Sequence, residues 1–182
     1  MRRRVVAAVV VTAVAVSVAA AVAAVARRPE PLTAKRLAAY TDAIAPPLSD
    51  GGRVVEQGMK PGVADLLNRH AVPPATIAVE AAEWERELTR VRGAVAAVPV
   101  PPGLGEAAAL FDRALAGYVE AAELFRRAAL APEGQRRAIA DRGFTAAEAA
   151  DRTYDAASRI VQRERRRLGL GPTATLPDPT PT

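Results

Sequence analysis

The segment LGEAAALFDRALAGYVEAAELFRRAALA, residues 104–131, carries the clearest structural signal in the sequence. Its apolar residues recur at alternating steps of four and three, the heptad pattern of a helix that packs against other helices. These positions are Leu104, Ala108, Phe111, Leu115, Tyr118, Ala122, Phe125 and Ala129. A second column, at 107, 114, 121 and 128, is entirely alanine, whereas the column at 106, 113, 120 and 127 alternates Glu and Arg. The pattern predicts a long helix with one tightly packed side and one solvated side.

The neighbouring segments predict further helices. Residues 75–98 repeat the heptad seam at Ile77, Ala81, Trp84, Leu88, Val91, Val95 and Val98. A helix is expected over residues 33–45, with Thr33 as its N-cap, because Ser and Thr accept hydrogen bonds from the first backbone amides. The last helix is expected from Glu133 to Leu168, ended by Gly169, with a restart at a capping box of Thr145 and Glu148.

The least regular part of the chain follows the proline pair 46–47, which is expected to end the first helix. Residues 49–70 keep a helical rhythm of apolar residues, yet they contain Gly58 and Pro61, so a kinked or broken helix is expected. Segment 50–62 is read either as a turn or close helix approach, or as a specific contact site with exposed backbone groups. The sequence leaves its role open.

These elements predict an all-α fold, an antiparallel bundle of four to five helices, because short proline-containing turns join long helices with heptad seams. The bundle is expected over residues 33–168. It follows an N-terminal membrane-spanning or signal helix within residues 1–28 and a short linker at 29–32. The tail, residues 169–182, is rich in Pro and Thr and is expected to be disordered.

The N-terminal segment carries the strongest functional information. Residues 5–26 form an uncharged run of valine and alanine with one Thr and one Ser. As a helix this run is about 33 Å long, enough for the hydrocarbon core of a bilayer. Ala24 to Ala26 form an A-x-A signal-cleavage site, but the run is longer than an ordinary signal core, so cleavage and retention both stay open. A cleaved signal and a retained anchor both predict that the bundle is exported, because three arginines precede the run and two follow it.

Charge and cysteine content exclude several classes of protein. The net charge is +5, but residues 1–28 contain five arginines and no acid, which leaves twenty basic and twenty acidic residues in the remainder. A charge-balanced bundle has no excess positive charge for a phosphate backbone, so no nucleic-acid partner is expected. The chain has no cysteine, which excludes disulfides and thiolate chemistry.

The remainder offers few catalytic groups. Its only serines are Ser49 and Ser158 and its only histidine is His70, with no G-x-S-x-G motif. A carboxylate metal site in a bundle needs Glu-x-x-His, which is absent, and the glutamates at 80, 83, 87, 120 and 123 are expected outside the core. We expect no catalytic residue, no metal and no cofactor.

Two groups of residues are candidate binding sites. Four aromatic residues at or near the seams could line a ligand groove, although core packing is the ordinary role of such residues: Trp84, Phe111, Tyr118 and Phe125. Four arginines in the last helical turns could contact an anionic surface, although cations also favour a helix C-terminus: Arg163, Arg165, Arg166 and Arg167.

The sequence therefore predicts a non-catalytic, extracytoplasmic helical-bundle protein of the bacterial cell envelope with a structural or protein-interaction role. The alternative is a small-ligand or lipid-binding helical module. The expected partners are the membrane, through the N-terminal segment, and either another protein or a second copy of the chain. The expected location is the cell membrane, or outside the cell after signal cleavage.

Overall fold

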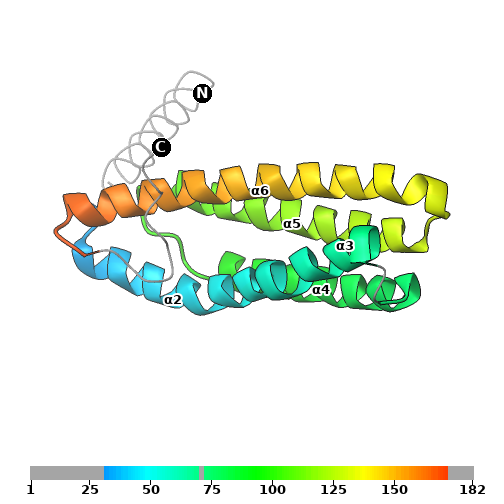
Figure 1. Ribbon diagram of the computed structural model, residues 1–182. Coiled ribbons are helices and arrows are strands. Elements are labelled where there is room, and N and C mark those ends of the chain that lie inside the picture. Colours follow the sequence, from blue (N-terminus) through cyan, green and yellow to red (C-terminus); the bar gives the residue numbers. More distant parts are fainter. Residues whose placement is uncertain (1–30, 70–71, 172–182) are drawn as a thin grey trace, which may run out of the picture. The chain divides into compact units, whose positions relative to one another are not determined.

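Four helical rods make up the part of the chain that the computed structural model describes, residues 31–69 and 72–171. The first rod is α2 (Ala34–Arg53), continued by the π-helical η1 (Val54–Met59), by α3 (Lys60–Ala64) and by the π-helical η2 (Asp65–Arg69). The other rods are α4 (Pro74–Ala96), α5 (Gly105–Leu130) and α6 (Glu133–Arg167) (Figure 1). The described residues contain no strand, as an all-α prediction requires.

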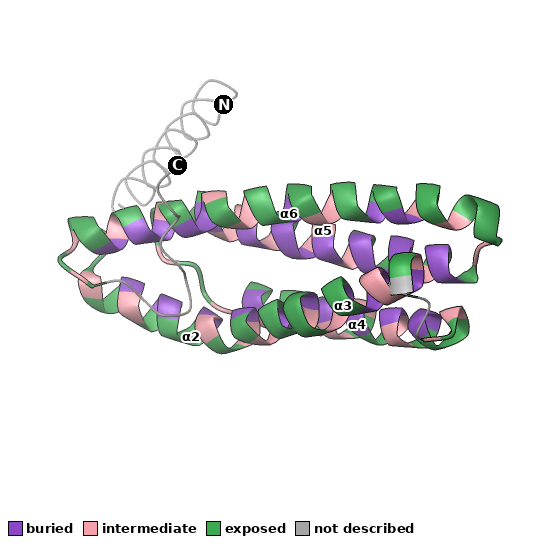
Figure 2. Cartoon of the chain, in the orientation of Figure 1, coloured by how far each residue is buried: buried purple, intermediate pink, exposed green. Residues whose placement is uncertain are grey.

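Successive rods run in opposite directions, and each buries one stripe of residues against its neighbours (Figure 2). The predicted heptad seams lie on these stripes: within α4 and α5 every seam residue is buried except Ala108, which is half-buried. The alanine column of α5 is fully buried, and Glu106, Arg113, Glu120 and Arg127 are exposed on the opposite side. The helical bundle expected from the sequence is therefore the fold of residues 32–69 and 72–171.

Small side chains let α5 and α6 approach closely. A Cβ atom placed on Gly117 would lie 3.0 Å from the Cβ of Ala150, tighter than ordinary contacts. The ring of Phe111 meets that of Tyr154 edge-to-face, with centroids 5.3 Å apart. Gly117 of α5 and Ala150 of α6 thus allow the close backbone approach on which the α5–α6 pair depends.

The predicted end of the first helix at Pro46 and Pro47 is wrong, because both prolines lie inside α2. Each proline removes one backbone donor, but Ile44 and Leu48 on either side of the pair are buried in the core. Packing of this apolar face holds the helical path where local propensity alone would end it.

A kinked or broken helix is expected near Gly58 and Pro61, and of these two forms the break is wrong, since the backbone stays helical from Ala34 to Arg69. Its irregularity is a change of hydrogen-bonding register: the Lys60 amide donates to the Val55 carbonyl, five residues earlier, as in a π-helix. Gly58 and Gly62 both face Trp84. A Cβ on Gly62 would lie 2.5 Å from the indole, so this rod can cover Trp84 only with glycine there.

The last helix does not restart at Thr145. α6 is continuous, and the Thr145 hydroxyl donates to the Asp141 carbonyl at 3.0 Å instead of capping a new helix. Gly143 has a packing role, because a Cβ there would lie 2.5 Å from the Phe125 ring. The glycine that resembles a helix break in the sequence is the point where α6 passes over an aromatic ring of α5.

The predicted N-cap at Thr33 and the predicted end of the last helix at Gly169 are confirmed. The Thr33 hydroxyl accepts from the Arg36 amide at 3.3 Å as an N-cap. After α6, Gly169 adopts φ +72°, its amide bonds the Arg166 carbonyl at 3.1 Å, and the Leu170 amide bonds the Arg165 carbonyl at 2.9 Å. These two bonds form a Schellman motif, which needs a left-handed residue and favours glycine.

Within residues 31–69 and 72–171, no helix is both long and apolar enough to span a bilayer. The predicted membrane or signal segment, residues 5–26, and most of the predicted disordered tail, from residue 172 onward, lie outside the described residues.

Candidate functional site

A cleft of about 490 Å³ lies between the first rod and α6 and is the candidate binding site. One wall consists of the end of α2 and the start of η1, and the opposite wall is one face of α6. The floor comes from α5. Its lining residues are Leu48, Ser49, Gly51, Gly52, Arg53, Val55, Glu56, Gln57, Leu115, Tyr118, Asp151, Tyr154 and Asp155.

The cleft stays open because the facing surfaces are polar or small. On α6 the wall carries Asp151 and Asp155, one turn apart and both exposed. On α2 the wall carries Gly52, whose Cβ position has open space around it. The apolar lining residues Leu48, Val55 and Leu115 are buried and contribute to the core beside the cleft.

Two tyrosines join the floor to the acidic wall. The Tyr118 hydroxyl donates to Oδ1 of Asp151, linking α5 to α6. Burial, followed by the hydrogen bond to Asp151, raises the pKa of Tyr118 well above its ordinary value. Burial likewise raises the pKa of Tyr154 to about 12, with Asp155 adding to the rise. Both phenols are therefore neutral hydrogen-bonding groups at physiological pH.

The cleft continues into a smaller cavity of about 290 Å³ further along the same two rods. Val55 and Asp151 line both spaces. Phe125 and Phe144, whose ring centroids are 5.3 Å apart, form an apolar wall of the smaller cavity, and Phe144 is 39% exposed. The two spaces together form one groove with a polar half and an apolar half.

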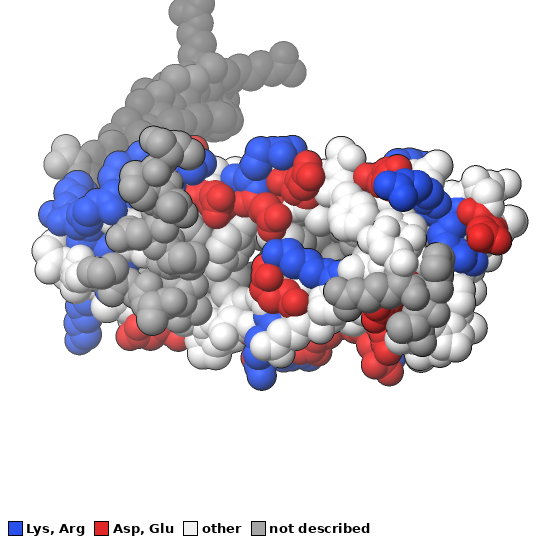
Figure 3. Space-filling model, in the orientation of Figure 1, with Lys and Arg blue, Asp and Glu red and all other residues white. Residues whose placement is uncertain are grey.

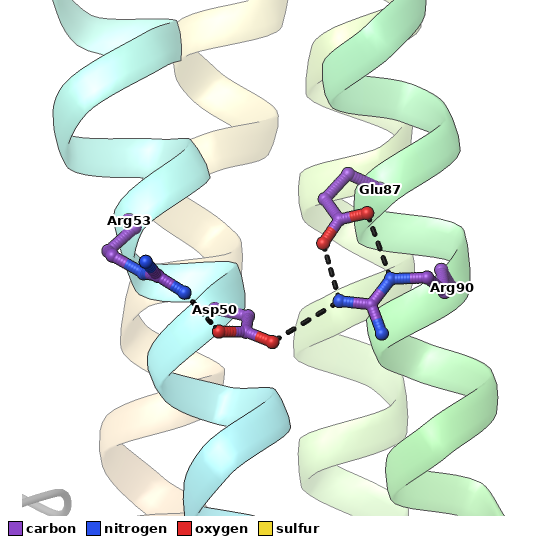
Figure 4. A network of polar contacts seen from close by, with 4 residues as sticks. All are labelled: Asp50, Arg53, Glu87 and Arg90. Atoms are coloured by element: carbon purple, nitrogen blue, oxygen red, sulfur yellow. Dashed lines mark hydrogen bonds and ion pairs between the residues drawn. The ribbon is translucent and has the colours of Figure 1, made fainter.

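A network of charged residues fixes the rim on the α2 side (Figure 4). Arg53 bonds Asp50, and Nη2 of Arg90 on α4 lies 3.2 Å from the other Asp50 oxygen. Nε of Arg90 also bonds Glu87 at 2.9 Å. The hydrogen bond from Arg53 is the main cause that lowers the pKa of Asp50. Arg53 is thereby partly neutralised. Of the three carboxylates in the cleft lining, Glu56 is paired with Lys60 at 2.5 Å, so the acidic character of the cleft comes from Asp151 and Asp155.

The four aromatic residues predicted to line a ligand groove are divided between the core and the groove. Tyr118 lines the main cleft and Phe125 lines the smaller cavity. Phe111 is completely buried in the half of the core near the start of α2, and Trp84 is buried beneath Gly58 and Gly62 in the other half. The structure therefore brings Tyr118 and Phe125 to the groove, and places Trp84 and Phe111 in the core as packing residues.

The four C-terminal arginines likewise differ in burial and do not form one surface. Arg163, Arg166 and Arg167 are exposed, and Nε of Arg167 bonds Glu164 at 2.7 Å. Arg165 is only 8% exposed: Nη1 donates to the Thr41 hydroxyl of α2, and Nε donates to the Gly171 carbonyl, both at 2.9 Å. Arg165 joins two helices in the interior and cannot share a surface with the other three.

The sequence indicated part of this site. Segment 50–62, named as a contact candidate, supplies one wall, and the irregularity expected there was the available signal. Asp151 and Asp155 were missed, since acidic residues on an exposed helical face are ordinary. Only the tertiary structure places them opposite the irregular segment.

Within the described ranges, no group of three or more His, Asp or Glu residues is placed to hold a metal ion. Chemically, the groove can accept hydrogen-bond donors and positive charge at its acidic wall and an apolar group beside Phe144.

Comparison with known proteins assigns this chain to no family. No protein-family model, curated protein or solved structure matches this chain.

Proposed function

We propose that this protein is a non-catalytic cell-envelope protein whose helical bundle lies outside a bacterial cytoplasmic membrane and has a structural or protein-interaction role. One sequence observation carries the proposal. The whole net charge of +5 flanks the uncharged run 5–26, with three arginines before it and two after it. This order favours a cytoplasmic N-terminus and an exported bundle, whether the segment is cleaved or retained.

The residue inventory supports a non-catalytic role. Ser49 is exposed on α2 and Ser158 is buried in α6. The single histidine, His70, lies outside the described residues. The cleft contains carboxylates and neutral phenols, which suit hydrogen bonding to a ligand.

Intact mass of the protein in separated membrane and soluble fractions of an expressing bacterium tests the proposal. Full-length protein in the membrane, digested by protease added to spheroplasts, would identify a tethered protein. Loss of residues up to Ala26, with the product outside the cytoplasm, would identify a released one. Full-length protein in the cytosol, protected from protease, would refute export.

The groove favours a second candidate function, the binding of a small ligand. The α6 wall of the cleft carries Asp151 and Asp155, whereas Arg53 and Glu56 on the other wall are each ion-paired, with Asp50 and Lys60, and aromatic residues line the apolar extension. Electrostatic complementarity favours a cationic group, and the apolar half favours a ligand with an aromatic or alkyl body. An aromatic or alkyl amine has both features.

Thermal unfolding with such amines, and with the matching carboxylic acids, tests this function, because a ligand that binds only the folded state raises Tm. Gly52→Phe fills the cleft, and Gly93→Phe is its matched control, an exposed helical glycine of α4 with equally open surroundings. Amines should stabilise the wild type and Gly93→Phe but not Gly52→Phe. Equal shifts in all three proteins, or none, would refute the cleft as a ligand site.

A further inference from the structure

We infer that the bundle stands with one end against an anionic lipid surface, namely the end where α2 begins and α6 finishes. This inference rests on the proposed function, in which segment 5–26 inserts into the membrane. We define the basal end as residues 32–42, 94–106 and 160–171, and the distal end as residues 62–69, 72–82 and 123–141.

At the basal end, described residues from all four rods pack against one another. Leu37 of α2, Val95 of α4 and Val161 of α6 belong to one buried cluster, together with Leu104 just before α5. The bond from Arg165 to Thr41 ties α6 directly to α2 in the same region. The first turn of α2 and the last turns of α6 therefore present their outer residues on one end of the molecule (Figure 1).

The basal end is basic, whereas the distal end is balanced. The basal ranges contain six basic residues, Lys35, Arg36, Arg163, Arg165, Arg166 and Arg167, and three acidic ones, Asp42, Glu106 and Glu164. The distal ranges contain five basic and five acidic residues. Apart from Arg165, all the basal cations are exposed, and Figure 3 shows basic side chains gathered where α2 begins and α6 ends. Charge complementarity thus selects the basal end for an anionic surface.

The sequence also places this end close to the membrane. Only residues 27–31 separate the uncharged run from Leu32, and five residues span at most about 18 Å when fully extended. The loop between α4 and α5 adds an apolar group at this end, since Val100 is 46% exposed and residues 94–105 carry no charge. Such a pairing of exposed cations with an exposed apolar residue suits the headgroup region of a bilayer.

Single-cysteine labels on the full chain test the inference, because the sequence contains no cysteine. Val100→Cys places an environment-sensitive fluorophore at the basal end. Leu130→Cys is its matched control, an exposed apolar residue of the distal end. Each protein is reconstituted into phosphatidylcholine vesicles with and without phosphatidylglycerol, both containing a lipid-bound quencher.

We expect the quencher to reach the Val100→Cys label in phosphatidylglycerol vesicles, and the Leu130→Cys label to stay unquenched. Raising the ionic strength from about 0.01 M to about 1 M shortens the Debye length from about 30 Å to about 3 Å and should reverse most of this quenching. Lys35→Glu with Arg163→Glu should also reverse it. The distal pair Arg127→Glu with Arg137→Glu should leave it unchanged.

Flotation of the same vesicles separates this inference from the proposed function. Two results would refute only the orientation, provided that the protein floats with the vesicles. One is equal quenching of both labels, and the other is quenching that neither salt nor the basal charge reversal changes. Protein that does not float would refute both. Unchanged thermal unfolding of the charge variants establishes that they remain folded.

Discussion

Gly143 is the residue at which packing and local propensity conflict most clearly. It lies in the middle of α6, where glycine is unfavourable, yet a Cβ there would lie 2.5 Å from the Phe125 ring. Gly143→Ala should therefore lower the free energy of unfolding by about 1–3 kcal/mol, the usual cost of overpacking. Chemical denaturation followed by circular dichroism measures the change.

Gly134→Ala is the control for this prediction, because Gly134 is exposed near the start of α6 with open space at its Cβ position. It should leave stability unchanged or raise it by less than about 1 kcal/mol. Equal effects at the two glycines would contradict the role assigned to Phe125.

Tyr118 makes stability depend on pH. Its pKa in the folded protein lies above the ordinary value of 10.0, so above this pH the unfolded chain loses the phenolic proton while the folded chain keeps it. Stability present below pH 10 is therefore lost as the pH rises further, by up to about 1.4 kcal/mol per pH unit for each such group. The urea midpoint should fall above pH 10.

Tyr118→Phe should make this decline shallower, because Tyr40 and Tyr154, whose pKa values burial also raises, remain. Comparing urea midpoints of the two proteins at neutral and alkaline pH checks the prediction. Parallel declines would show that Tyr118 ionises as freely as an exposed phenol.

At the scale of elements, Arg165 connects the last turns of α6 to α2 and to the backbone that follows α6. Arg165→Met keeps much of the aliphatic stem but leaves the Thr41 hydroxyl and the Gly171 carbonyl without their charged donor. It should lower the free energy of unfolding by about 1–3 kcal/mol. Arg163→Met, on the exposed side of the same helix, should change it by less than about 0.5 kcal/mol. Denaturation of both variants tests the difference, and equal losses would mean that Arg165 is not a helix-to-helix link.

The first rod shows how tertiary contacts override local signals in an element. Pro46, Gly58 and Pro61 each predict an interruption, but Leu48, Met59 and Val63 are buried on the face that meets the bundle. A continuous rod keeps these three side chains in the core, and the change to π-helical bonding adjusts the register between them. Neither the continuity of the rod nor its π-helical stretches could be predicted from helix propensity, because propensity does not include the stability gained by burying these three side chains.

At the scale of the whole molecule, the bundle has two buried clusters, one at the basal end around Phe111 and one further along around Trp84 and Phe125. α4 and α5 contribute buried residues to both clusters. Because these continuous helices connect the two halves, a chain that begins at Leu32 should fold and unfold in one cooperative transition.

Trp84 is the only tryptophan, so its fluorescence reports the cluster around it, while far-ultraviolet circular dichroism reports all helices. The two midpoints should coincide in urea for the chain that begins at Leu32. Separate midpoints would mean that the two halves unfold independently, and a chain without helical signal would mean that residues 1–31 are needed for folding.

The sequence by itself determined the all-α class, the bounds of the helices to within a few residues from 74 onward, and the solvated and packed sides of α5. Heptad spacing, alanine columns and the caps at Thr33 and Gly169 are local signals, and they need no knowledge of the partner helices. Only the tertiary structure decided that the first rod continues through its prolines, that Arg165 is interior, and that a groove opens between the first rod and α6. Each of these depends on which side chains meet across the bundle, and contacts between residues distant in the sequence, such as Thr41 and Arg165, leave no periodic trace in it.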